Sequence, residues 1–195
     1  MSEAKILLVS AISFLGGLSS LWFLGSRLDR LGSKPVLTFC FVLWLAVLAG
    51  WVTLSGGLLR PKMSLIFILE FLMGLLAALA QMSNTRLAMA VIPVVGRNHF
   101  FAIYSVLGNV TLGIAPIGWG MLIDAVGSHA PFWCGLSWNR YTVFFAAAAF
   151  VFVVALALAR LLEEPEAASM EALLREILIQ SPQRFWLRFW PRGGA

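Results

Sequence analysis

Five long apolar stretches constrain the fold of this chain more than any other feature. They cover residues 6–24, 36–54, 64–93, 100–123 and 141–162. A helix needs about 20 mainly apolar residues to cross the roughly 30 Å hydrocarbon core of a bilayer. The sequence therefore predicts an all-α fold, a polytopic membrane bundle of five transmembrane helices. The third stretch would make about 45 Å of helix, so we expect it to tilt or to extend beyond the bilayer.

The composition excludes two other broad classes of protein. Hydrophobic residues make up 61% of the chain and charged residues only 12%. A soluble domain carries about 25% charged residues, whereas a disordered chain combines low hydrophobicity with high charge. Two cysteines and two histidines lie far apart along the chain, so we expect neither a disulfide framework nor a metal site. No cofactor is expected either.

The positive charges gather on one side of the predicted spans. Because the spans alternate in direction, residues 25–34, residues 96–99 and the C-terminal tail lie on the same side of the membrane. Together they contain nine lysines and arginines. The opposite side receives four, namely Lys5, Arg60, Lys62 and Arg140. Because connections rich in lysine and arginine stay in the cytoplasm, we expect the N-terminus outside and the C-terminus in the cytoplasm of a bacterial inner membrane. The net charge of +5 is thus attributed to topology, and nucleic acid is not an expected partner.

The first connection carries the most specific motif in the chain. Residues 25–34 read Gly-Ser-Arg-Leu-Asp-Arg-Leu-Gly-Ser-Lys. This segment resembles the signature loop of the major facilitator superfamily, G-x-x-x-D-R-x-G-x-[KR], with matches at Gly25, Asp29, Arg30, Gly32 and Lys34. Arg27 departs from the pattern, because the family usually has an apolar residue there. An alternative interpretation treats the basic residues as topology anchors only, but it does not account for the spacing of the two glycines and the aspartate.

The resemblance implies a partial fold and a function. In this superfamily such a loop follows the second helix of each six-helix half, so the chain resembles helices eight to twelve of a twelve-helix transporter. The implied activity is secondary active transport of a small solute by alternating access, carried out by a truncated or split C-terminal half. A missing N-terminal half or a second copy of the chain would complete the cavity. The alternative is a non-transporting membrane scaffold or remnant that retains the half-fold.

An enzyme is not expected. No pair of acids, histidine–acid set or nucleophile–base arrangement falls near one end of the predicted spans.

Three polar side chains are candidates for lining a cavity or coupling transport to an ion: Glu70, Arg86 and Asn109. Glu70 is the only acid deep within a predicted span, and intramembrane acids usually face a bundle interior or an aqueous cavity. The alternative for Glu70 is an interfacial position facing Lys62. The alternative for Arg86 is a cytoplasmic helix end, and for Asn109 it is a hydrogen bond to a neighbouring helix.

Glycines and a proline recur in the fourth predicted span. Gly113, Pro116, Gly118 and Gly120 permit close helix packing, and Pro116 removes a backbone hydrogen bond. This pattern predicts either a gating hinge or a passive packing surface.

The last segment, residues 164–195, differs in composition from the transmembrane region, residues 1–163. Apolar residues recur at helical spacing between residues 170 and 178, which predicts a short interfacial amphipathic helix. Arginines and aromatic rings then alternate, among them Arg184, Trp186, Arg188 and Trp190. We expect this tail to lie in the cytoplasmic headgroup layer of the lipid bilayer, with its arginines on anionic lipid. Docking onto a partner protein is the alternative.

Overall fold

The computed structural model of the chain describes residues 3–24, 33–92, 96–127 and 130–161. Within these ranges lie five long helices: α1 (Glu3–Leu24), α3 (Ser33–Ser55), α4 (Met63–Val91), α5 (Arg97–Val126) and α6 (Arg140–Leu161). Each of them is long and apolar enough to cross a membrane. The predicted number of membrane helices and the all-α class are confirmed.

The third membrane helix ends where the local sequence requires it to end. α4 stops at Val91, and Ile92 adopts an extended conformation with φ −73° and ψ 124°. Position 93 is a proline, which disfavours the helical conformation in the residue before it. The 29 residues of α4 make about 44 Å of helix, which exceeds the thickness of the hydrocarbon core.

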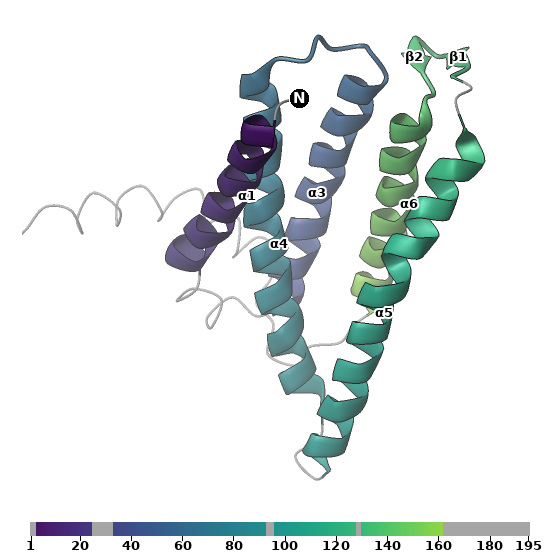
Figure 1. Ribbon diagram of the computed structural model, residues 1–195. Coiled ribbons are helices and arrows are strands. Elements are labelled where there is room, and N and C mark those ends of the chain that lie inside the picture. The colour runs from purple at the N-terminus through teal and green to yellow at the C-terminus, as the bar shows by residue number, and fades with distance from the viewer. Residues whose placement is uncertain (1–2, 25–32, 93–95, 128–129, 162–195) are drawn as a thin grey trace, which may run out of the picture.

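The helices run side by side along the long axis of the molecule (Figure 1). α3 and α4 form an antiparallel pair, α1 packs against α4, α6 packs against α3, and α5 lies along α6. The buried cluster lies between α3 and α4 and consists of Val36, Cys40, Val47, Leu69, Leu76 and Leu79. Most large apolar side chains on the outer faces are exposed, as suits helices that lipid surrounds.

The contact between α1 and α4 brings two helix backbones together. A Cβ atom added at Gly74 would overlap the backbone carbonyl of Ser13, and one added at Gly16 would overlap that of Phe71. Only glycine fits both positions, so the two helices touch through their main chains. Small residues serve this purpose in membrane helices, where packing rather than the hydrophobic effect drives association.

The contact between α3 and α6 is built differently, from aromatic rings. Trp44 stacks on Phe152 with ring centroids 4.9 Å apart, and Trp51 stacks on Phe145 at 5.2 Å. The two tryptophans are seven residues apart on α3, and the two phenylalanines are seven residues apart on α6. The rings therefore follow one face of each helix for two turns. These stacked rings give the α3–α6 contact a specific register.

A short β-hairpin connects α5 to α6, and the sequence did not predict it. β1 (Phe132–Trp133) pairs antiparallel with β2 (Leu136–Ser137). The two turn residues, Cys134 and Gly135, both have positive φ, 54° and 78°. Two positive φ values in a two-residue loop are typical of a type I′ turn, which suits the twist of a hairpin.

Hydrogen bonds tie this hairpin to the adjoining ends of α3 and α6. The Asn139 side chain accepts from the backbone N–H groups of Tyr141 and Thr142, both at 3.0 Å, and so caps the start of α6. Its amide also donates to the carbonyl of Ser55, at 2.7 Å, at the last turn of α3. The backbone N–H of Ser137 donates to the carbonyl of Gly56 at 2.9 Å. One end of the α3–α6 pair is therefore fastened by polar contacts.

Candidate functional site

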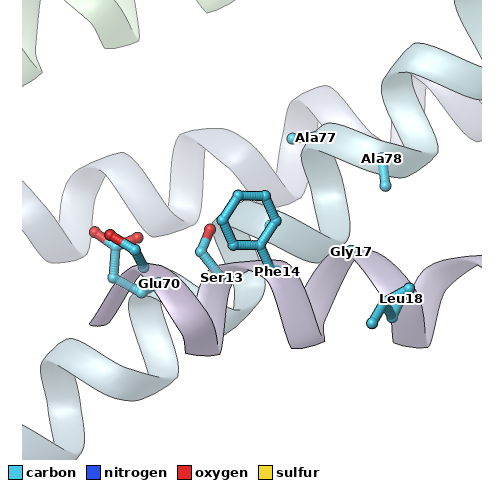
Figure 2. Close-up of a pocket in the computed structure, with 9 residues that line it drawn as sticks. Ser13, Phe14, Gly17, Leu18, Glu70, Ala77 and Ala78 are labelled. Carbon is cyan, nitrogen blue, oxygen red and sulfur yellow. The ribbon is translucent and has the colours of Figure 1, made fainter. Parts of the chain in front are cut away.

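A groove of about 680 Å³ follows the α1–α4 contact. Its lining comes from these two helices: Ser10, Ser13, Phe14, Gly17 and Leu18 of α1, and Glu70, Gly74, Ala77 and Ala78 of α4. Figure 2 shows most of these side chains on the two helices that form the groove. A groove of this size holds a small organic molecule.

The helical repeat of both sequences places these residues on one face. The α1 members recur at spacings of three and four residues from Ser10, and those of α4 do the same from Glu70. Apart from Glu70, the α4 lining consists entirely of glycine and alanine, and Gly17 adds no side chain from α1, so little side-chain volume fills the space. Gly74 thus has two roles, because it permits the close crossing and leaves the groove open beside it.

The groove has a polar end and an apolar end. Glu70 and Ser13 lie at one end in Figure 2, the Phe14 ring lies next to them, and Leu18 and Ala78 lie at the other end. Glu70 follows the first residue of α4 by seven positions, which places it about 10 Å along the helix. Its side chain is half-buried. The carboxylate is therefore held within a membrane-spanning segment, in a groove that two serine hydroxyls and apolar side chains also line.

The structure does not bring the three predicted cavity residues together. Arg86 is half-buried on α4, sixteen positions after Glu70, which corresponds to about 24 Å along one helix. Asn109 is exposed on α5, a helix that contributes nothing to the groove. Of the three candidates, Glu70 alone lines the groove.

One polar residue near Arg86, Asn84, links α4 to a neighbouring helix. The side-chain amide of Asn84 donates to the Tyr104 hydroxyl at 2.7 Å, which links α4 to α5. The hydroxyl of Thr85 donates to the carbonyl of Gln81, at 2.9 Å, within its own helix. This segment acts as a junction between two helices in the described structure.

The small residues of α5 face open space. A Cβ atom added at Gly113, Gly118 or Gly120 would meet no atom within 4 Å among the described residues. Pro116 lies inside α5, and the helix continues through it from Arg97 to Val126. No residue of α5 is buried within the part of the chain that the structure describes. The predicted packing surface is therefore present but uncovered there.

The signature loop is described only at its last two residues, Ser33 and Lys34. Gly25, Asp29, Arg30 and Gly32 lie outside the described residues, as do the tail residues Arg184, Trp186, Arg188 and Trp190. The Lys34 ammonium donates to the backbone carbonyl of Arg160 at 3.3 Å. Arg160 belongs to the last turn of α6, where free carbonyls and the helix dipole favour a cation. Lys34 thus joins the start of α3 to the end of α6.

Sequence reasoning missed Ser10 and Ser13 in the groove and Asn139 at the hairpin. Asn139 precedes the last apolar stretch with only Arg140 between them, which is a position where asparagine caps helices, so the capping rule would have identified it. The two serines stand three positions apart in an apolar helix, and that spacing marks a shared face. That these serines share a groove with Glu70 of α4 has no signal in the sequence.

Comparison with known proteins agrees with this architecture. No curated protein and no solved structure matches the chain. The sequence model of the Major Facilitator Superfamily matches residues 1–191, nearly the whole chain. This match is consistent with the membrane helices found here and with the loop that resembles the superfamily's signature. The chain belongs to the Major Facilitator Superfamily, and its function is membrane transport of the kind that this family performs.

Proposed function

We propose that this chain is part of a secondary active transporter that moves a small solute by alternating access, and that the α1–α4 groove forms one wall of the solute path. The observation that carries the proposal is the placement of Glu70. An acidic side chain inside a membrane span faces a water-filled cavity or a partner, because exposure to lipid costs several kcal/mol. Glu70 lines a groove large enough for a small solute.

Helices beyond α1, α3, α4, α5 and α6 would form the other wall of the path. Substrate sites in secondary transporters lie near the bilayer midplane between two structural repeats. The groove opens on one side of the α1–α4 pair, and the α5 glycines present a second uncovered surface. A first half of the transporter, or a second copy of this chain, would cover these surfaces.

The distribution of lysine and arginine predicts how the proposed transporter lies in the membrane. The N-terminal ends of α1 and α4 would face the outside of a bacterial cytoplasmic membrane, and residues 25–34 would face the cytoplasm. Cys134 is exposed at the hairpin, whereas Cys40 is buried. A membrane-impermeant maleimide added to intact cells should therefore label Cys134. Labelling only after the cells are opened would contradict this orientation.

The tail is assigned to the cytoplasmic lipid surface. Arginines alternating with aromatic rings suit a membrane–water interface that contains anionic lipid. A peptide of residues 183–195 should bind vesicles containing phosphatidylserine. Binding that persists unchanged after Arg184, Arg188 and Arg192 are replaced by glutamine would contradict the electrostatic part of this assignment.

Cysteine accessibility tests the transport proposal without knowledge of the substrate. Ser13→Cys, in a background with Cys40→Ala and Cys134→Ser, places a single thiol in the groove. We expect a water-soluble maleimide to reach it, at a rate that changes when a proton gradient is imposed on membrane vesicles. Phe150→Cys is the matched control, because Phe150 is 69% exposed on α6 away from the groove and should face lipid. A Ser13→Cys thiol as unreactive as this control would contradict the proposal and favour a non-transporting scaffold.

A further inference from the structure

We propose that the α1–α4 groove binds an organic cation with an apolar body, its ammonium group at Glu70 and its body toward Leu18 and Ala78. The inference deepens the proposed transport function and rests on it, because it names the class of solute that this groove recognises.

The charge in the groove argues for a cation. Glu70 is the only charged residue among those that line it. Among the described residues, no hydrogen bond or ion pair to the Glu70 carboxylate is found. A carboxylate inside a membrane is stabilised by an opposite charge, and a ligand ammonium supplies one.

The two hydroxyl groups fit the same ligand. Ser10 and Ser13 line the groove with Glu70, and Figure 2 shows Ser13 toward the same end of the groove as Glu70. A hydroxyl oxygen accepts a hydrogen bond, so these side chains offer acceptors to an N–H donor that the carboxylate attracts. A ligand anion would find no positively charged side chain in the groove.

The other end of the groove argues for an apolar body. Leu18, Ala77 and Ala78 offer only carbon atoms from their side chains, and the Phe14 ring lies between this end and the polar end. An aromatic face also attracts a cation that approaches within about 6 Å. The arrangement suits a molecule whose charge is confined to one end. A sugar or another polyol would leave most of its hydroxyl groups without partners here.

Two ligands of the same shape separate charge recognition from shape recognition. The probes are 2-phenylethylammonium and its uncharged analogue 2-phenylethanol. Binding of each is measured by calorimetry to the full chain in nanodiscs of phosphatidylcholine, whose zero net charge limits non-specific adsorption of the cation. We expect the ammonium compound to bind about tenfold more tightly than the alcohol, as a charged hydrogen bond implies.

Three variants locate the ligand. Glu70→Gln should weaken binding of the ammonium compound about tenfold and leave binding of the alcohol unchanged, since only the charge is lost. Ala78→Phe should weaken binding of both compounds, because the new ring fills the apolar end. Asp124→Asn is the control, because it removes an exposed carboxylate on α5 outside the groove and should change neither affinity. Helical content and elution volume confirm that each variant is folded.

Equal affinity of the wild-type chain for both probes, or an unchanged affinity of Glu70→Gln for the ammonium compound, would overturn the assignment. An absence of binding by either probe would also overturn it and would favour another helix as the occupant of the groove. If the thiol of Ser13→Cys is reactive but the assignment fails, transport through the groove stands and the solute is of another class. If that thiol is also unreactive, the proposed function fails as well.

Discussion

The glycines of the α1–α4 contact and those of α5 are the same residue in opposite environments. At Gly74 an added Cβ atom would overlap the backbone of α1, whereas at Gly118 it would meet nothing within 4 Å. Both lie in apolar helices that are long enough to cross a membrane. The difference separates a unit of four closely packed helices, α1, α4, α3 and α6, from a fifth helix with few contacts of its own. It shows that a glycine in a membrane helix permits close packing only where a neighbour is present to use it.

The largest effect on stability should come from adding a methyl group at Gly74, compared with the same addition at Gly118. Gly74→Ala forces α1 away from α4, and we expect the free energy of unfolding to fall by roughly 2–3 kcal/mol, as in other overpacked sites. Gly118→Ala is the matched change on α5, and it should be neutral or stabilising by less than about 1 kcal/mol, since alanine favours the helix. Reversible unfolding in mixed detergent measures both. Equal losses in the two variants would mean that the two environments do not differ.

An intermediate effect should distinguish the starts of α6 and α5. Asn139→Ala removes the cap of α6 and the hydrogen bond to Ser55, so stability should fall by about 1–2 kcal/mol. Asn98→Ala makes the same change at the start of α5, where Asn98 is exposed and the helix has no side-chain cap. We expect that variant to unfold within about 0.5 kcal/mol of the wild type, as exposed sites usually do. A comparable loss at Asn98 would show that α5 is anchored as firmly as α6.

The smallest effect should concern the link between α4 and α5. Tyr104→Phe removes the acceptor of the hydrogen bond from Asn84 and should cost about 0.6 kcal/mol, the average for such bonds between membrane helices. The more sensitive readout is hydrogen exchange of the α5 amides, which should become faster. Tyr141→Phe on α6 is the control, and its exchange pattern should match that of the wild type. Unchanged exchange in Tyr104→Phe would indicate that other contacts hold α5 in place.

The membrane helices were predictable because their signal is local. The free energy of transfer into hydrocarbon is a sum of separate contributions from each side chain. A run of apolar residues therefore predicts a membrane span whatever packs beside it. Helix ends followed from equally local rules, as at Ile92, which precedes a proline. The hairpin at residues 132–137 escaped prediction because its strands are two residues long and give no periodic pattern.

The candidate site was predictable only in part. An acid deep in a span is conspicuous in the sequence, and Glu70 does line the groove. Arg86 and Asn109 were grouped with it because all three are polar, but composition carries no information about which faces meet. The structure places them on other surfaces, about 24 Å along the helix in the case of Arg86 and on α5 in the case of Asn109.

The sequence by itself determined that this chain crosses a membrane, how many helices do so, and to which family it belongs. The tertiary structure alone decided that α1 meets α4 at Gly16 and Gly74, and that Ser10 and Ser13 lie along one groove with Glu70. The physical reason is that partition into lipid depends on each residue separately, whereas packing depends on pairs of surfaces. Gly74 and Gly118 have the same hydropathy, and only the helix beside Gly74 distinguishes them.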